Sequence, residues 1–556
     1  MITNKQIAAN FKLLSQLMEL YGDDSFKIKS YSNASRVIEK LPVELSSLPH
    51  EKLFEIAGIG KAIGNKIAEQ FETGSFRVLN DYVSKTPAGI LEMMRIKGLG
   101  PKKIAAIWND LEIENVGELL YACNENRLML YKGFGEKTQN NIREAIEFYL
   151  SNRGSFLYAE IEHYALSFDK YLKESFAGYT FLLTGEFHRN AITIDLLEWI
   201  TDAPEYIINE IVHGNEFIIH EKNNDFIHIK NAANLSIHFI YSANENIINN
   251  YFKHNCSNAF YELFIDKFPS VATKHFATEE NIFNENHMQF IPAYLREDEK
   301  WIGIAQKNEL PEVIETKDIK GIIHTHSKWS DGGSPLRELA QYIKDKGFEY
   351  LVISDHSQTA VYANGLTIER IIEQHREIDE LNKALAPFKI FKSIESDILP
   401  DGRLDYSDDV LKTFDLVIAS VHSVLRMNEE KAMQRLIKAI ENPYTRILGH
   451  PTGRLLLSRP GYPVDYKKLI DACAANHVAI ELNANPRRLD IDWHWIGYAL
   501  EKDVLISINP DAHSLNGIHD IRFGVLAAQK AGVTLHNNLS SLNLSAFELF
   551  LANKTH

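Results

Sequence analysis

The stretch GIIHTHSKWSDGG (321–333) carries two histidines, two positions apart, at the end of an apolar run, and an aspartate follows. On a β-strand, residues i and i+2 point to the same face, so His324 and His326 are predicted to present their imidazoles side by side. Asp331 lies just beyond them. Two histidines alone do not establish a metal site, and the neighbouring strands therefore decide what this stretch does.

Six more short apolar runs follow in the same region. They are EYLVISDHS, FKIFKSIESD, FDLVIASVHS, TRILGHP, VAIELNAN and VLISINPDAH, and amphipathic stretches such as PLRELAQYIKDKG separate them. Short buried strands that alternate with helices are typical of a parallel α/β sheet. We therefore expect a distorted (β/α)7 barrel over residues 316–556.

Metal-ligating side chains recur at the carboxyl ends of these strands, which meet on one face of a parallel barrel. They are His324, His326, Asp331, His356, Glu395, His422, His450, Asp511 and His513. Nine ligands exceed what one ion of four- to six-fold coordination takes, so two or three ions are expected, with Glu395 as the bridge. Imidazoles and carboxylates without thiolate suit Mn²⁺, Zn²⁺ or Fe²⁺.

The first 150 residues contain three turns of the form Gly-apolar-Gly, each leading into an amphipathic helix. The turns are AGIGKAIG (57–64), KGLGPKKI (97–104) and KGFGEKTQ (132–139). Glycines allow a tight turn, and the free N–H groups of the following helix offer a phosphate site. The residues expected to contact phosphate are Gly58, Gly60, Lys61, Gly98, Gly100, Lys102, Lys103, Gly133, Gly135 and Lys137.

The overall composition is compatible with this expectation. The 556-residue chain has a net charge of −16, but residues 1–150 hold 19 Lys+Arg and 19 Asp+Glu, so the excess of acid lies beyond them. A local surface can bind phosphate although the whole chain is acidic. Three separated cysteines favour a reducing cytoplasm, and no apolar run approaches the ~20 residues of a membrane helix.

The three turns resemble helix-hairpin-helix motifs, which contact the nucleic-acid backbone without reading bases. Together with FKIKSYSNASRVIEKLP (26–42), the first turn resembles the 8-kDa domain of family X DNA polymerases. The resemblance implies a helical domain over 1–85 and a second helix-hairpin-helix region over 86–150. It also places Lys66 where lyase-active members carry a Schiff-base lysine; a plain surface lysine is the alternative.

The middle of the chain resembles the α+β palm of these polymerases, but without its metal-binding carboxylates. In LLTGEFHRNAITIDLLEWI (182–200), Gly185 and Arg189 match the family, whereas Glu186 replaces a serine and the Asp-x-Asp pair is absent. Ser236 occupies the place of the third aspartate. Two-metal nucleotide addition needs such carboxylates. We therefore expect a degenerate palm and thumb over 151–290 and a linker over 291–315.

The C-terminal region resembles the PHP (polymerase and histidinol phosphatase) family, and the order of the domains resembles bacterial PolX. The resemblance implies one ion held by His324, His326, Glu395 and Asp511, a second by Glu395, His422 and His450, and a third by Asp331, His356 and His513. It implies catalytic roles for Glu395, Asp511 and His326. The guanidinium groups of Arg454, Arg487 and Arg488 are expected to bind substrate phosphate.

The metal cluster suits phosphoester hydrolysis, and the resemblance to PolX implies a metal-dependent 3′–5′ exonuclease that trims DNA ends in repair. Gapped, nicked or 3′-recessed DNA is the expected partner, bound through its backbone, and the protein is expected to be a cytoplasmic monomer. Three alternatives stay open: a gap-filling polymerase that also edits, a small-molecule phosphatase of the histidinol-phosphate type, and a DNA-end adaptor without catalysis.

Overall fold

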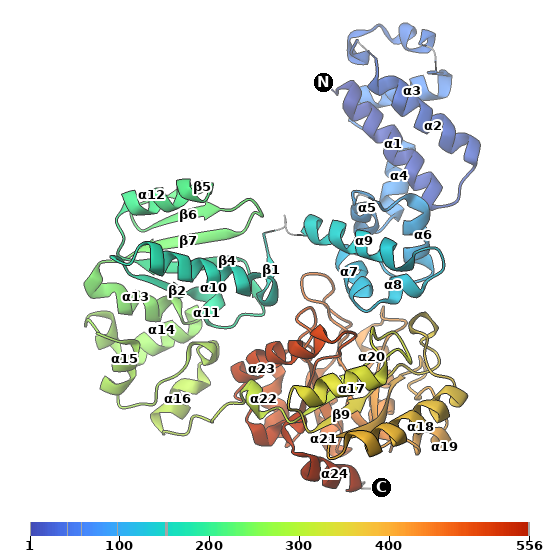
Figure 1. Ribbon diagram of the computed structural model, residues 1–556. Helices are drawn as coiled ribbons and strands as arrows, with labels where there is room; N and C mark the ends of the chain where they lie inside the picture. The colour runs from blue at the N-terminus through green and yellow to red at the C-terminus, as the bar shows by residue number, and fades with distance from the viewer. Residues whose placement is uncertain (1, 42, 57, 97, 151–153, 554–556) are drawn as a thin grey trace. The chain divides into compact units, whose positions relative to one another are not determined.

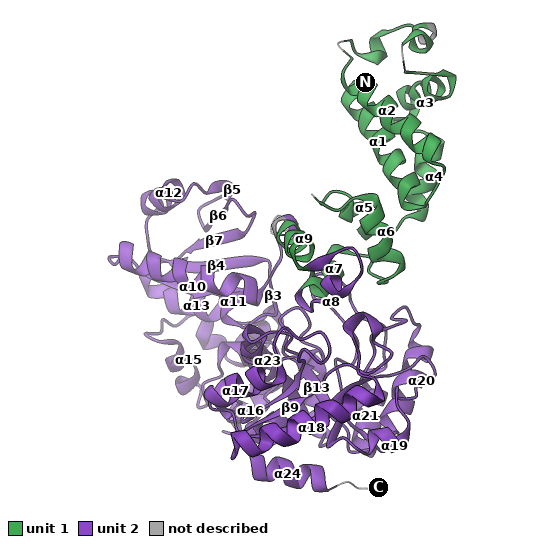
Figure 2. Ribbon diagram, turned by 45° about the vertical axis from the view of Figure 1, so that its right-hand side comes forward, with its two compact units in different colours: residues 1–123, 136–147 green, residues 124–135, 148–556 purple. Residues whose placement is uncertain are grey.

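The computed structural model describes residues 2–553 apart from 42, 57, 97 and 151–153. The chain divides into two compact units (Figure 2): Met1–Cys123 with Glu136–Glu147, and Asn124–Gly135 with Phe148–His556. The domain boundary expected at 150/151 adjoins residues 151–153, which lie outside the described ranges. The first unit is called the helical unit below.

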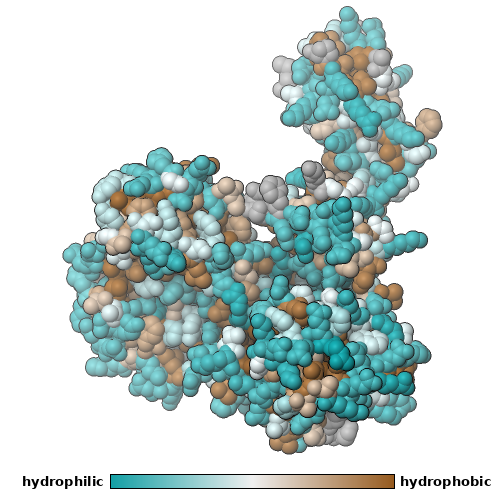
Figure 3. All heavy atoms as spheres, in the orientation of Figure 1, coloured by the Kyte–Doolittle hydropathy of each residue, from teal (hydrophilic) through white to brown (hydrophobic). Residues whose placement is uncertain are grey.

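The helical unit consists of short helices joined by tight turns. They are α1 (Asn4–Leu20), α2 (Ser25–Glu39), α3 (Lys61–Thr73), α4 (Arg77–Lys85), α5 (Ala88–Met93), α6 (Pro101–Asn109), α7 (Val116–Asn124) and α9 (Gly135–Leu150). Ile7, Phe11 and Leu14 of α1 are buried at helical spacing. Hydrophilic side chains predominate on the face of this unit seen in Figure 3.

Residues 154–306 form a domain around a mixed five-stranded sheet, called the sheet domain below (Figure 1). The strand order is β2 (Phe181–Thr184), β4 (Leu196–Thr201), β7 (Ser236–Tyr241), β6 (Phe226–Lys230) and β5 (Ile218–Lys222). Only β4 and β7 pair in parallel. Helix α10 (Tyr158–Ser175) packs on the sheet, where Trp199 and Phe239 lie in the core.

A second, aromatic core lies in the helices that follow the sheet. These are α13 (Ile247–His254), α14 (Asn258–Lys267), α15 (Glu279–Glu285) and α16 (Lys300–Gln306). Phe252, Phe264 and Phe283 form this core together with Trp301 and Ile302 of α16. The stretch 291–315, expected as a linker, thus contains a helix that packs inside this domain.

The C-terminal region is a nearly closed barrel of seven parallel strands, as expected. They are β8 (Gly321–Thr325), β9 (Tyr350–Ile353), β10 (Lys389–Asp397), β11 (Leu416–Ser420), β12 (Thr445–Leu448), β13 (Ala479–Asn483) and β14 (Ile506–Asn509), and they neighbour one another in chain order. A bridge from Thr325 to Ala512 brings the two edges together. Between the strands run α17 (Leu336–Asp345), α18 (Ile368–Leu385), α20 (Glu429–Ile440), α21 (Tyr466–Ala475) and α22 (Trp493–Glu501), and α23 (Ile521–Lys530) follows β14.

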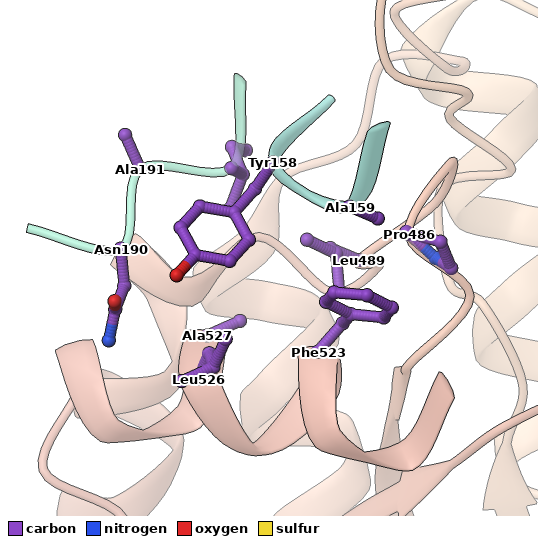
Figure 4. Close-up of a pocket in the computed structure, with 10 residues that line it drawn as sticks. Tyr158, Ala159, Asn190, Ala191, Pro486, Leu489, Phe523, Leu526 and Ala527 are labelled. Atoms are coloured by element: carbon purple, nitrogen blue, oxygen red, sulfur yellow. The ribbon is translucent and has the colours of Figure 1, made fainter. Parts of the chain in front are cut away.

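The sheet domain packs against the barrel through α23. Figure 4 shows a narrow apolar pocket at this joint, where Tyr158 of the sheet domain lies over Leu526 and Ala527 of α23. Arg522 of α23 makes an ion pair with Glu162 beside it. Apolar burial and ion pairing therefore hold these two domains together. Throughout the described ranges, every helix is too short or too polar to span a bilayer.

Candidate metal centre in the barrel

All nine expected ligands lie at the carboxyl ends of the barrel strands or just beyond them. Their side chains fall into overlapping groups whose ligand atoms lie within 4.8 Å of one another. These groups are His326, Asp331, His356 and His513; His324, His326 and Asp511; His324, Glu395 and His450; and His356, Glu395 and His422. The barrel thus collects one continuous cluster from residues that lie far apart in the sequence.

Glu395 of β10 stands at the middle of this cluster. Its Oε1 lies 2.9 Å from Nε2 of His450, 3.0 Å from Nε2 of His422 and 3.2 Å from Nε2 of His324. Its Oε2 lies 3.0 Å from Nδ1 of His356. A carboxylate with both oxygens surrounded by imidazoles has the arrangement that a bridging ligand needs.

The cluster has the donor set of a divalent-metal site. Several buried ligand atoms have no hydrogen-bond partner among the described residues: Nε2 of His324, Nδ1 of His326, Nε2 of His356, Oε2 of Glu395 and Nε2 of His513. Buried polar atoms are normally satisfied, and a cation would satisfy these lone pairs. Nitrogen and oxygen ligands without sulfur fit Mn²⁺, Zn²⁺ or Fe²⁺.

The cluster is also electrostatically coupled. Burial alone would lower the pKa of His513, but Asp331 outweighs it and raises this pKa to about 9. Burial together with the neighbouring imidazoles of His513 and His356 lowers the pKa of His326 to about 3. Without an ion, therefore, some imidazoles hold a proton that faces a carboxylate, and metal binding must displace it.

Three of the ligands sit on a left-handed backbone, which the sequence did not indicate. The φ angle is 61° at His324, 22° at His450 and 50° at Asp511. At His324 the pairing of β8 with β9 shifts by one residue, so β8 is not the regular strand that we expected. The bulge still leaves the rings of His324 and His326 with centroids 5.4 Å apart. Strained backbone of this kind clusters at functional sites.

Buried carboxylates outside the nine expected ligands orient those ligands. Glu481 of β13 lies 2.7 Å from Nδ1 of His324 and accepts the backbone N–H of His450 at 2.7 Å. A carboxylate oxygen of Asp397 lies 2.6 Å from Nδ1 of His422. Carboxylates behind imidazoles fix the ring that faces the metal. The sequence did carry one signal for Glu481. It lies two residues before Asn483 near the end of a buried strand, so both polar side chains point to the same face.

The three expected phosphate-binding arginines lie in different surroundings. Arg454 donates to the backbone of Arg488 and Leu489 and pairs with Asp492. Arg487 pairs with Glu160 of the sheet domain at 2.9 Å. Arg488 is the one of the three that borders the cluster, with its Nε 3.8 Å from Oδ2 of Asp511.

The acidic residues of the sheet domain make hydrogen bonds with separate partners, unlike the clustered ligands of the barrel. Glu186 accepts the backbone N–H groups of Asp195 and Leu196, and Asp195 accepts the hydroxyl of Ser155. Glu198 lies 3.3 Å from Nδ1 of His254. Within the described residues, no group of three metal-ligating side chains forms in this domain.

Arg189 of the sheet domain lies where this domain contacts the barrel. Its Nε donates to Glu297 at 3.0 Å, and one terminal nitrogen donates to the backbone oxygen of His254 at 2.8 Å. Lys530 of α23 donates to the backbone oxygen of Arg189 at 2.8 Å. The guanidinium is therefore engaged within the sheet domain, and Lys530 joins this group to the barrel through the Arg189 backbone oxygen and Glu297.

Two of the three glycine turns share one geometry. Gly58 and Gly98 have φ angles of 92° and 93°, and the second glycine of each turn caps the next helix. In the third turn Gly133 has φ 99°, but Gly135 also has a positive φ, 66°, and begins α9. Lys61 begins α3 and Lys66 follows in it, with its Nζ 5.7 Å from the centre of the Tyr31 ring.

The remaining expected phosphate-contact residues lie at the start of the helices that follow the second and third glycine turns, α6 and α9. Lys102 and Lys103 fall in the first turn of α6, and Lys137 falls in the first turn of α9. Lysines at these places sit beside the free N–H groups of the helix.

Comparisons with known proteins agree with this architecture. A helix-hairpin-helix domain model matches residues 2–76, and a SAM-like helix-hairpin-helix tandem model matches residues 90–147. The chain is 32% identical to the DNA polymerase/3'-5' exonuclease PolX of Bacillus subtilis, over 98% of this chain and 99% of that protein. It is 27% identical to a probable phosphatase of Thermoanaerobacter sp., over 39% of this chain and 89% of that protein. A probable phosphatase of Caldanaerobacter subterraneus is 29% identical, over 34% of this chain and 74% of that protein.

Proposed function

Because the chain belongs to the PolX family, we propose that it is a DNA-binding, metal-dependent phosphodiesterase that shortens DNA strands from the 3′ end. The observation that carries this proposal is the cluster of nine ligands at the mouth of the barrel, eight of them buried and several with unsatisfied ligand atoms among the described residues. The helix-hairpin-helix matches and the name of the Bacillus relative support DNA as the substrate.

Different side chains would bind the metal ions, orient the metal ligands and bind the substrate phosphate. Divalent ions, when bound, supply Lewis acidity and lower the pKa of a water molecule. Glu395, Asp511 and His326 would hold the ions next to the scissile phosphate, and Glu481 would keep His324 oriented towards them. Arg488 is the phosphate-binding arginine that we favour, because its Nε lies 3.8 Å from Oδ2 of Asp511 and so beside the expected ions.

We further propose that the sheet domain positions DNA and does not add nucleotides. Its acidic side chains do not form a three-ligand group among the described residues, and Glu186 occupies the place of the family's serine with a carboxylate. A negative charge there would repel an incoming triphosphate. Arg189, which could otherwise attract that triphosphate, pairs with Glu297.

The glycine turns would bind the DNA backbone, and Lys66 would form a Schiff base with an abasic sugar. The two turns with the same geometry, at Gly58 and Gly98, present helix N-termini and lysines to phosphate. Binding of this kind weakens as salt is raised, because counterions are released from the DNA.

The test uses Mn²⁺-loaded protein and a 5′-labelled DNA with a one-nucleotide gap, with and without dNTPs. Stepwise shortening that dNTPs do not reverse is expected, and it should be lost in His324→Ala. Shortening that persists in the double variant His324→Ala, Glu395→Ala would refute the assignment of the centre.

The main alternative is a gap-filling polymerase that also edits, which the name of the Bacillus relative favours. Extension by the templated base in the same assay would establish it. A small-molecule phosphatase is favoured by the two probable phosphatases that resemble part of the chain. It predicts turnover of phosphate monoesters that DNA does not inhibit.

A further inference from the structure

A short segment outside the barrel sequence lies against the metal centre. Residues Asn124–Gly135 belong to the same compact unit as the barrel. Asn126 has φ 58°, a conformation that asparagine tolerates, and it turns the chain into the short helix α8 (Arg127–Leu130). The Asn126 side chain donates to the backbone oxygen of Asp331, an expected metal ligand, at 3.2 Å.

This segment brings two charged side chains to the centre. Glu125 is buried, and its carboxylate lies within 4.8 Å of ligand atoms of Asp511 and His513. Nη2 of Arg127 lies 2.7 Å from Oε2 of Glu125, with 17% of the Arg127 side chain exposed. The charges of Asp331 and Glu395 act on the Arg127 guanidinium as well.

A tyrosine of the barrel completes this arrangement. The guanidinium carbon of Arg127 lies 4.8 Å from the centre of the Tyr362 ring, and α8 packs against η7 (Val361–Ala363). The Tyr362 ring is 6.4 Å from the ring of His356. Its hydroxyl is buried and has no hydrogen-bond partner among the described residues. A buried hydroxyl of this kind calls for an acceptor.

We propose that Arg127 and Tyr362 bind a phosphate oxygen of the DNA strand end beside the metal centre, and that Glu125 positions Arg127. A guanidinium offers a planar fork of donors that matches phosphate, and the tyrosine hydroxyl adds one more donor. The proposal rests on the phosphodiesterase function above and names a subsite of that same centre.

The subsite would make hydrolysis depend on a segment that carries the third glycine turn. Arg127 and Gly133 belong to the same segment. A DNA strand bound at the turn of Gly133 would therefore be held by the segment that also carries the Arg127 guanidinium. A DNA strand could contact both that turn and Arg127, whereas a free monoester could contact only the arginine. The segment would therefore favour a DNA strand over a free monoester.

The experiment measures binding of thymidine 5′-monophosphate, the expected product class, to the Mn²⁺-loaded full chain by calorimetry. Arg127→Lys should weaken binding about 10- to 100-fold, because it loses the fork and a charge-assisted hydrogen bond. Tyr362→Phe should weaken it about 2- to 10-fold through the loss of one neutral hydrogen bond. Metal content and melting temperature should stay at the wild-type values for both variants.

Matched controls remove the same groups elsewhere on the barrel. Arg403→Lys alters an exposed arginine that pairs with Asp401, and Tyr342→Phe removes a hydroxyl that pairs with His519; both should bind as the wild type does. If the wild type binds the nucleotide and cuts DNA while Arg127→Lys and Tyr362→Phe match it, only the subsite is refuted. If the wild type does neither, the proposed function falls as well. Loss of metal from Tyr362→Phe would also overturn the subsite, because it would indicate a structural role.

Discussion

Glu481 is the residue whose replacement tests the organisation of the metal centre most directly. Its side chain is fully buried in β13 and lies behind two ligands at once. One oxygen faces Nδ1 of His324 at 2.7 Å and Nδ2 of Asn509 at 3.3 Å, and the other accepts the backbone N–H of His450 at 2.7 Å. Glu481→Gln keeps the shape of the side chain but has only one acceptor oxygen.

The size of the effect follows from these contacts. If the amide oxygen stays with His324, the new NH₂ group faces the N–H of His450, and a buried donor without an acceptor costs about 1–3 kcal/mol. If the amide turns round, its NH₂ meets His324 and disfavours the tautomer that leaves Nε2 free. Loss of such a partner behind a ligand typically weakens metal binding by about 10- to 100-fold, or about 1.4–2.7 kcal/mol.

The assay is a stepwise Mn²⁺ titration of metal-free protein, with free Mn²⁺ followed by electron paramagnetic resonance. The step that involves His324, Glu395 and His450 should weaken. Binding by the group of Asp331, His356 and His513 should change little, because the side-chain hydrogen bonds of Glu481 among the described residues join it to His324, His450 and Asn509. Glu548→Gln, which alters an exposed carboxylate paired with Lys389, is the matched control. Equal affinities at every step for Glu481→Gln and wild type would refute this reasoning.

Three further outcomes are expected. In metal-free protein, Asp331 raises the pKa of His513 to about 9. The stabilisation of the fold by this pair is fully present below the ordinary histidine pKa of about 6.5 and is lost as pH rises through 9. Mn²⁺ binding should tighten over the same range, and denaturant unfolding and calorimetry between pH 6 and 9 check both trends. Arg189→Ala should lower the free energy of unfolding by about 1.5–3 kcal/mol, because Glu297 loses a charged hydrogen bond, and urea unfolding that matches wild type would contradict this. Lys66→Ala should abolish the adduct that borohydride traps with DNA carrying a 5′-deoxyribose phosphate, and an undiminished adduct would exclude the Schiff-base role.

The barrel was predictable because its signals are local. Each strand is a short apolar run with a polar ligand at its carboxyl end, and parallel strands must bring those ends together. The contact between Glu481 and His324 was not predictable in this way, since 157 residues separate them and their strands are not neighbours in the sheet. Asn126 and Asp331 are 205 residues apart, and no periodicity links them. The left-handed backbone at His324 likewise depends on a register shift that tertiary packing imposes.

The retention of Arg189 has a physical explanation that does not require nucleotide addition. Its guanidinium pairs with Glu297, and Lys530 of the barrel donates both to Glu297 and to the backbone oxygen of Arg189. Burial lowers the pKa of Lys530 to about 8, and its ammonium group donates to Glu297 and to the backbone oxygen of Arg189. Removal of either cation would leave partly buried acceptors unsatisfied. The contacts with Glu297 and with Lys530 of the barrel therefore suffice to explain why an arginine stands at position 189. The exposed Asp195 is not held by these contacts.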